Sequence, residues 1–419
     1  MVRTALLVGT YTSGSDKGEC EECLEELRRL CDTYGLRVAD KIACPLKKME
    51  AATYLGTGKL TEIFQAAESY SCDVVIFDNE ISPHQQRNLE KILKRAVIDR
   101  TELIIEVFAQ RAQTREARLQ VELAKVKYQF PRLRRLWTHL SRQSAGGGAY
   151  LKGEGEKQIE IDRRLLRRRI EQLQREIEEV SKQRETQRSA RRRSGIPTFA
   201  IVGYTNAGKS TLLHALTRAQ VLIEDKLFAT LDTTTRKFTL PNNQEILLID
   251  TVGFIRKIPH TVVAAFRSTL EEALHTDILL HLVDASHVAA LAQAEATRQV
   301  LKELGAERHP MITVLNKIDA CPNPAILARL RVEYPKTVPI SALTGEGLDA
   351  LIDLMGEEVS ALRKTYKLRI PQSHYALISE LMRTGRVITS EYVENDVLLD
   401  VEVPSQLEHK VLPFLTGGL

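Results

Sequence analysis

One nine-residue segment, from Gly203 to Thr211, constrains the fold of this 419-residue chain more than any other feature. It matches the phosphate-loop pattern of glycine, four residues and then Gly-Lys-Ser. The apolar run 198–202 before it and the amphipathic run 210–216 after it predict a strand, a loop and a helix. In such a unit the loop N–H groups and the start of the helix hold phosphates. Lys209 would reach the β- and γ-phosphates, and the Ser210 hydroxyl would ligate Mg²⁺. The candidate binding residues are Gly203, Tyr204, Thr205, Asn206, Ala207, Gly208, Lys209, Ser210 and Thr211.

A second motif follows the strand predicted over residues 245–249. It reads Asp250-Thr251-Val252-Gly253. An aspartate at the end of a strand suits a direct or indirect Mg²⁺ partner, and a glycine lets its N–H approach a γ-phosphate. The candidate residues of this motif are Asp250, Thr251, Val252 and Gly253.

A third motif indicates the base that is bound. The strand predicted over 311–315 leads into Asn316-Lys317-Ile318-Asp319. A carboxylate accepts two hydrogen bonds from the N1–H and N2–H₂ groups of guanine, a donor pair that adenine lacks. We therefore expect Asp319 to select guanine, Asn316 to brace the loop, and the Lys317 stem to cover the base. After the strand predicted over 337–340, a backbone N–H of Ser341, Ala342 or Leu343 would meet the guanine O6.

The order of these motifs predicts an open α/β sheet, because ligands of such sheets bind where strands end. Residues 1 to about 105 also alternate apolar runs with helical patterns, which predicts a smaller α/β domain. The last segment, 363–419, reads as a strand, a helix over 373–382 and strands over 385–392 and 396–403. The predicted domains are 1–110, 111–193, 194–362 and 363–419.

Two heptad seams occupy the region between the α/β parts. Apolar residues recur at alternating intervals of four and three over 119–140, with Pro131 expected to kink or break that helix. A second seam covers 159–180, and the glycines at 146–148, 153 and 155 predict a loop between the two. These seams predict an antiparallel helical hairpin. Residues 111–193 hold 23 Lys/Arg against 11 Asp/Glu, although the whole chain has a net charge of only +4, so this hairpin suits a polyanion partner such as rRNA.

Residues upstream of the phosphate loop narrow the comparison to one family. Asp78-Asn79-Glu80-Ile81-Ser82-Pro83, Asp99-Arg100-Thr101, Phe108-Ala109-Gln110-Arg111-Ala112 and the run 119–124, with the glycine loop, resemble the HflX family of ribosome-associated, translation-factor-type GTPases. The resemblance implies GTP hydrolysis with Mg²⁺, binding to the large ribosomal subunit and its rRNA, and separation of stalled or idle ribosomes during stress. It also implies that switch I comprises Phe228, Ala229, Thr230, Leu231 and Asp232, with Thr230 as the second Mg²⁺ hydroxyl and Thr234 as the alternative.

The residue after Gly253 is Phe254, where many GTPases place a glutamine that orients the attacking water. A phenylalanine ring cannot hold water, so we expect slow intrinsic hydrolysis that the ribosome stimulates. The catalytic water-orienting element stays unknown. Arg236, Arg256 and Lys257 are candidate stabilisers of transition-state charge.

Several weaker signals have alternative interpretations. The resemblance allows a second nucleotide site, for ATP, at Gly56-Thr57-Gly58-Lys59, although a helix start is the simpler interpretation. Cys20 and Cys23 have metal-site spacing, but buried thiols on one helix face are favoured. A GTP-controlled coiled coil that binds a protein partner is the alternative function. An RNA-modifying enzyme is disfavoured, because no nucleophile or metal cluster is visible.

The chain shows no apolar run of about 18 residues, so no membrane span is expected. We expect a cytoplasmic monomer with reduced thiols, and transient membrane association is left open.

Overall fold

The computed structural model describes residues 3–133, 152–193, 195–218, 227–228, 230–231, 233–257, 273–307, 309–404 and 407–416. The chain divides into two compact units. The first contains residues 1–180 together with 224–232 and 256–267, and the second contains 181–223, 233–255 and 268–419. No helix in the described ranges is both long and apolar enough to cross a membrane.

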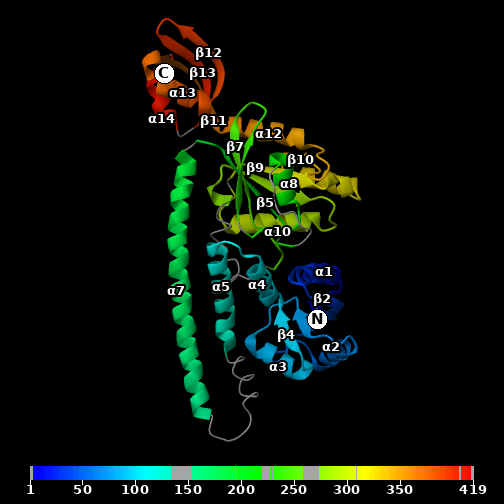
Figure 1. Ribbon diagram of the computed structural model, residues 1–419. Coiled ribbons are helices and arrows are strands. Elements are labelled where there is room, and N and C mark those ends of the chain that lie inside the picture. The colour runs from blue at the N-terminus through cyan, green and yellow to red at the C-terminus, as the bar shows by residue number, and fades with distance from the viewer. Residues whose placement is uncertain are drawn as a thin grey trace. The chain divides into compact units, whose positions relative to one another are not determined.

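The first unit begins with a parallel four-stranded sheet in the order β2-β1-β3-β4 (Figure 1). One face of this sheet is covered by a core of buried aliphatic side chains that includes Leu60, Ile63 and Leu89 of the neighbouring helices. The elements are β1 (Thr4–Tyr11), α1 (Lys17–Tyr34), β2 (Arg37–Pro45), α2 (Thr57–Ser69), β3 (Val74–Phe77), α3 (Pro83–Leu93), β4 (Ala96–Asp99) and α4 (Arg100–Arg111). The predicted small α/β domain is therefore confirmed.

The helical hairpin is built from α5 (Arg115–Gln129) and α7 (Lys152–Arg193), which lie side by side in Figure 1. Leu119, Leu123 and Val126 of α5 pack on Leu173 of α7, with Leu166, Ile170, Ile177 and Val180 partly buried beside them. The predicted seams thus contact each other. Pro131 lies in a 3₁₀ turn, Phe130–Arg132, where α5 has ended, as its missing N–H requires. Trp137, Leu140 and Gly146 to Gly148 lie outside the described residues.

The prediction of a loop at Gly153 and Gly155 was wrong, because α7 begins at Lys152 and includes both glycines. In the first turn of a helix the N–H groups have no intrahelical partner, so helix formation there depends less on the residues' own propensity. At its other end α7 continues to Arg193, the last residue of the predicted hairpin domain.

The second unit contains a six-stranded sheet in the order β10-β9-β8-β5-β7-β6, in which β6 alone pairs antiparallel. Helices cover both faces, with one core that includes Leu212 and Met355 and another that includes Ala294 and Leu330. The elements are β5 (Thr198–Gly203), α8 (Lys209–Thr217), β6 (Thr234–Thr239), β7 (Glu245–Asp250), β8 (Ile278–Asp284), α10 (Ala290–Glu303), β9 (Met311–Asn316), α11 (Pro324–Glu333), β10 (Thr337–Pro339) and α12 (Leu348–Ala361). This is the predicted doubly wound nucleotide-binding fold.

The C-terminal part forms an antiparallel sheet in the order β11-β13-β12. Its core includes Ile370, Leu381 and Val401. The elements are β11 (Arg363–Pro371), α13 (Tyr375–Thr384), β12 (Arg386–Val393), β13 (Asp396–Pro404) and a short α14 (Glu408–Val411). The predicted helix over 373–382 begins two residues later than expected and extends two residues further.

A histidine that the sequence analysis did not single out lies in the middle of the second unit's sheet. His281 of β8 is 0% exposed, and its ring meets the edge of Tyr334 with 5.8 Å between centroids. Neither ring nitrogen has a hydrogen-bond partner among the described residues. Burial, with a smaller effect of Arg298, lowers the pKa of His281 to about 4. The folded chain therefore holds this imidazole neutral.

The pKa of His281 is lower in the folded chain than in the unfolded chain, so the unfolded chain binds a proton on this histidine more tightly. As the pH falls, protonation of His281 therefore favours the unfolded chain. The free energy of unfolding should therefore drop between pH 6.5 and about 4, by about 2–3 kcal/mol at pH 4.5 relative to pH 7. Urea unfolding of the wild type and of His281→Leu at both pH values measures this. The variant should lack this part of the pH dependence, and equal pH slopes for the two proteins would contradict the prediction.

Candidate functional site

The phosphate loop joins β5 to α8 in a conformation that depends on its two glycines. A Cβ on Gly203 (φ +155°) would lie 2.3 Å from the Leu282 carbonyl oxygen, and one on Gly208 (φ +95°) would lie 2.4 Å from Asn316 Nδ2. Gly208 is the N-cap of α8, where it offers no side-chain acceptor to the first N–H groups of the helix. The loop thus presents a helix start toward an incoming anion, the geometry that phosphates favour.

Lys209 lies in the first turn of α8 and is 7% exposed. Its Nζ donates to the carbonyl oxygens of Gly203 (3.2 Å) and Tyr204 (2.8 Å). Burial lowers the pKa of Lys209 to about 8, against the opposing effect of Asp250. A buried ammonium held by carbonyls at a helix start is a ready partner for phosphate oxygens.

The Asp250 carboxylate and the Ser210 hydroxyl lie together below the loop. Ser210 Oγ donates to Asp250 Oδ2 at 2.8 Å, and Asp250 is 0% exposed at the end of β7. A buried carboxylate beside a hydroxyl is an oxygen donor set that suits Mg²⁺. These residues therefore fit the metal that the sequence predicted, with Ser210 as the ligand and Asp250 beside it.

The remaining side chains of the first two motifs mostly support the loop. Thr251 is 1% exposed and its hydroxyl donates to the Ile201 carbonyl oxygen at 2.7 Å. Val252 and Tyr204 are each 4% exposed. Gly253 contacts the phosphate loop so closely that a Cβ there would lie 2.8 Å from both Lys209 Nζ and Thr205 Cα. Any contact of Thr251, Val252 or Tyr204 with nucleotide would therefore come from the backbone.

Asn316 ties the phosphate loop to the loop that follows β10. Its Nδ2 donates to the Ala207 carbonyl oxygen at 2.8 Å, and its Oδ1 accepts from the Ala342 N–H at 2.9 Å. The side chain is 2% exposed at the end of β9. This is a bracing geometry, because one amide fixes the two loops that flank a nucleotide.

Asp319 is exposed in the 3₁₀ turn Ile318–Ala320. Lys317, at φ +63°, forms an ion pair with Asp284 at 2.7 Å. Ser341 is 0% exposed and Ala342 is 6% exposed, whereas Leu343 is 80% exposed. The residues predicted to contact guanine thus include two that are exposed, Asp319 and Leu343. Their contact with a base stays a prediction.

The described residues of the predicted switch I, Phe228, Thr230 and Leu231, group with the first unit. Phe228 is 2% exposed and lies edge-on to Phe108 of α4, with 4.5 Å between ring centroids. Leu231 is also buried, and Thr230 is half-buried. Ala229 and Asp232 lie outside the described residues. Thr234, the alternative Mg²⁺ residue, begins β6 and pairs there with Asp250.

The three residues predicted to stabilise transition-state charge each contact another part of the protein. Arg256 pairs with Glu22 at 3.1 Å and Lys257 with Asp78 at 2.5 Å, both within the first unit. Arg236 donates to the Thr235 carbonyl oxygen next to it. Phe254 is 2% exposed, so the position that a water-orienting glutamine would take is filled by a buried ring.

Sequence reasoning missed a buried ionic network at the ends of β3 and β4. Arg100 (2% exposed) bonds Asp78 at 2.7 Å and also Glu26. Asp99 caps α4 by accepting from the Glu102 N–H, and it pairs with Arg132 at 3.3 Å. The sequence did contain an indication of this network, because Asp78 and Asp99 both stand directly after apolar runs. In the sequence analysis these two aspartates supported only the family resemblance.

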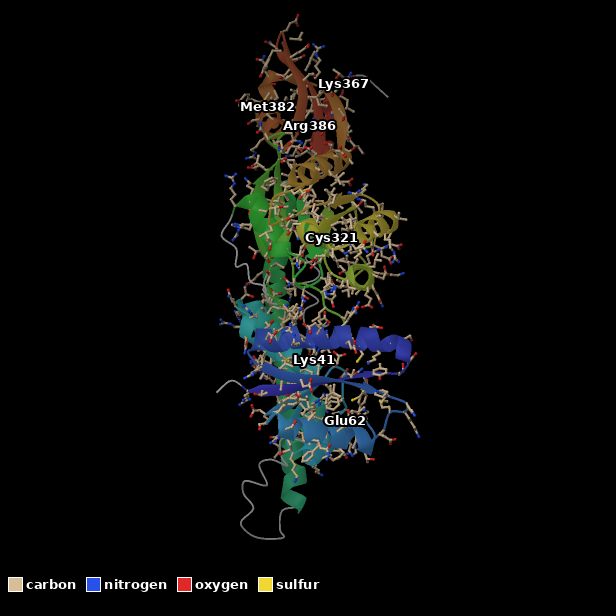
Figure 2. The ribbon with its side chains drawn as sticks, turned by 90° about the vertical axis from the view of Figure 1, so that its right-hand side faces the viewer. Lys41, Glu62, Cys321, Lys367, Met382 and Arg386 are labelled. Atoms are coloured by element: carbon tan, nitrogen blue, oxygen red, sulfur yellow. The ribbon has the colours of Figure 1, made fainter. Side chains whose placement is uncertain are left out.

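The Gly56–Lys59 segment and the cysteines near the N-terminus have structural roles in the first unit. Gly56 is the N-cap of α2, and Lys59 in its first turn pairs with Glu62, which is labelled in Figure 2. Cys20, Cys23 and Cys31 are buried on one face of α1, and burial raises the pKa of Cys20 to about 11 and that of Cys31 to about 12. Within the described part of the chain, no cluster of three or more His, Cys, Asp or Glu could hold a metal.

Three family models match consecutive parts of the chain. Residues 21–109 match the GTP-binding GTPase N-terminal model, 111–191 match the GTP-binding GTPase middle region, and 198–317 match the 50S ribosome-binding GTPase model. Together they match more than half of the chain.

Curated relatives match over nearly the full length. GTPase HflX of Chlamydia pneumoniae is 49% identical over 415 residues, which cover 98% of this chain and 88% of the relative. GTPase HflX of Akkermansia muciniphila is 45% identical, with 99% and 97% covered, and that of Escherichia coli is 43% identical, with 91% and 90% covered. With the phosphate loop, the Asp250 motif and the Asn316 motif assembled at one sheet edge, the chain belongs to the HflX family of GTPases.

Proposed function

We propose that the protein binds GTP with Mg²⁺, hydrolyses it to GDP and phosphate, and in its GTP form binds the large ribosomal subunit and separates stalled or idle ribosomes. The observation that carries this proposal is the assembly of Lys209, Ser210, Asp250, Asn316 and Asp319 at the carboxyl ends of neighbouring strands. Open α/β sheets bind nucleotides at that edge. The family model that matches this part describes a 50S ribosome-binding GTPase.

When bound, Mg²⁺ would neutralise charge on the β- and γ-phosphates, with Ser210, and Thr230 as predicted, supplying hydroxyl ligands. Lys209 would bind the phosphate oxygens, Gly253 would offer its N–H to the γ-phosphate, and Asp319 would orient the guanine. Because Phe254 cannot orient water, hydrolysis by the isolated chain would be slow, and contact with the ribosome would stimulate it.

We place the domain boundaries at residues 1–110, 111–193, 194–362 and 363–419. The family models fall within the first three of these ranges. We propose that the protein acts as a monomer in the cytoplasm. A second nucleotide site, for ATP at residues 56–59, is a separate proposal.

The hairpin supplies the proposed rRNA contact. Arg163, Arg164 and Arg168 of α7 are exposed, whereas Arg169 bonds Glu122 at 2.6 Å and Arg167 lies over the Phe130 ring at 5.8 Å. The first three arginines are therefore open to solvent, while Arg169 joins α7 to α5 and Arg167 contacts the 3₁₀ turn that follows α5. Arginines on one exposed helix face suit the phosphates of a folded RNA.

Sucrose-gradient sedimentation of 70S ribosomes tests the proposal. The wild type with GTP or a non-hydrolysable analogue should convert 70S particles to subunits, and GDP should not. The double variant Arg163→Glu/Arg164→Glu should split far fewer ribosomes and bind the large subunit with a smaller salt dependence, since each lost phosphate contact reduces the slope of log K against log salt by roughly 0.7–0.9.

Arg329→Glu/Arg331→Glu is a matched control, because these arginines are exposed on α11 and make the same charge change. Unchanged 70S peaks with every nucleotide would overturn the splitting proposal. Salt-independent association of the hairpin would instead favour a protein partner.

A further inference from the structure

The turn that follows β8 holds the guanine loop, the name used here for residues 316–319, and both belong to the second unit. The Ala285 N–H of this turn donates to the Asn316 carbonyl oxygen at 2.9 Å. The thiol of Cys321, which is labelled in Figure 2, lies directly after the loop and donates to the Ala285 carbonyl oxygen at 3.3 Å. The turn therefore contacts the chain at the beginning of the guanine loop and just beyond its end.

Asp284, the last residue of β8, has a carboxylate whose two oxygens do different things. Its Oδ1 accepts from the Ser286 N–H at 3.0 Å and from the Ser286 hydroxyl at 2.6 Å. Its Oδ2 lies 2.7 Å from Lys317 Nζ, and the Asp284 side chain is only 12% exposed. Because Ser286 fixes one oxygen, the other is directed toward Lys317 by the turn itself.

The backbone of Lys317 is fixed as firmly as its ammonium group. Its φ of +63° and ψ of 39° place it in the left-handed region, which a residue with a side chain adopts only where its surroundings hold it there. The next N–H, that of Ile318, donates to the Ile340 carbonyl oxygen at 3.2 Å. The four-carbon stem of Lys317 is therefore held at both ends, by the backbone and by Asp284.

A stem held in this way matters for the base that Lys317 is predicted to cover. A free lysine side chain has many rotamers, and ordering it on a ligand costs entropy. The Lys317 stem is already ordered by Asp284, so it can lie on a base without that cost. Contacts that are ordered in advance mainly change how fast a ligand leaves, whereas the rate of encounter varies less.

We propose that Asp284 is a positioning residue for nucleotide binding, which holds the Lys317 stem over the guanine base and thereby slows release of the nucleotide. Asp284 lies outside the four sequence motifs and acts on the nucleotide only through Lys317. The inference rests on the proposed binding of guanine nucleotides. GTP and GDP carry the same base, so Asp284 slows the release of both to the same extent.

Stopped-flow kinetics of the full-length chain with fluorescent GDP and a fluorescent non-hydrolysable GTP analogue test the inference. Asp284→Asn keeps an oxygen that accepts from Ser286 and places an amide N–H₂ group where the ammonium of Lys317 needs an acceptor. We expect the dissociation rate constants of both nucleotides to rise about 5- to 10-fold, with the association rate constants changed by less than about twofold.

A double-variant cycle separates positioning from a general structural effect. Lys317→Met keeps an apolar stem without the charge, and adding Asp284→Asn to it should change the dissociation rate constants by less than about twofold. Glu358→Gln is the matched control, because Glu358 is 10% exposed and pairs with Lys336 at 2.6 Å outside the site.

Three results would contradict this inference. Dissociation from Asp284→Asn within twofold of the wild type, or effects of Asp284→Asn and Lys317→Met that simply multiply, would overturn it and leave the proposed function standing. A wild-type chain that binds neither nucleotide would overturn the proposed function and this inference together.

Discussion

Asp319→Asn is expected to lower the affinity for GTP by a factor on the order of 10² and to give the protein a preference for xanthosine triphosphate. A carboxylate accepts two charge-assisted hydrogen bonds from guanine, each stronger than a neutral one. An asparagine amide retains one acceptor and adds an N–H₂ donor, which meets the O2 carbonyl that xanthine carries in place of the guanine amino group. Losing such hydrogen bonds costs about 2–4 kcal/mol, which corresponds to the expected factor.

Competition of both triphosphates against a fluorescent nucleotide measures this change. Asp319 is exposed in its turn, so the substitution should leave the thermal unfolding midpoint unchanged within about 1 °C. Asp353→Asn, at an exposed position of α12, makes the same chemical change outside the site and should bind like the wild type. If Asp319→Asn keeps the wild-type order of GTP over xanthosine triphosphate, the guanine assignment is wrong.

The site residues that the sequence predicted correctly to lie near one another share one property. Gly203, Asp250 and Asn316 each end a buried strand, and the parallel pairing of β5, β7, β8 and β9 brings those ends to one edge. A local pattern therefore sufficed, because the topology of an open α/β sheet fixes where strand ends meet. The hairpin was predictable for a similar reason, since seven-residue spacing determines which faces of α5 and α7 pack.

The ionic network could not be predicted in the same way. Asp78 and Lys257 are separated by 179 positions, and no local periodicity links them. The same holds for Phe108 and Phe228, whose contact places switch I against α4. His281 was missed because one polar residue in the apolar run of β8 does not alter the strand pattern, although its burial determines its protonation. Long-range pairs and single buried polar groups thus required the three-dimensional structure.

Asn316→Ala is expected to lower the affinity for GTP by a factor on the order of 10² to 10³, although Asn316 has no predicted contact with the nucleotide. Its amide satisfies the Ala207 carbonyl oxygen and the Ala342 N–H, and the side chain is 2% exposed. Removing it leaves a buried acceptor and a buried donor unpaired, each at a cost of about 1–3 kcal/mol. The loops can regain those hydrogen bonds from water only by moving apart, which separates the phosphate contacts from the guanine contacts.

Titration with a fluorescent GTP analogue and with fluorescent GDP should therefore show that both affinities fall together. Asn316→Asp keeps an acceptor for the Ala342 N–H but turns a carboxylate oxygen toward the Ala207 carbonyl, so it should bind no better than Asn316→Ala. Asn242→Ala, in an exposed turn after β6, controls for the loss of an amide. If Asn316→Ala bound GTP within threefold of the wild type, the two loops would hold their positions without this amide, and the bracing role would be refuted.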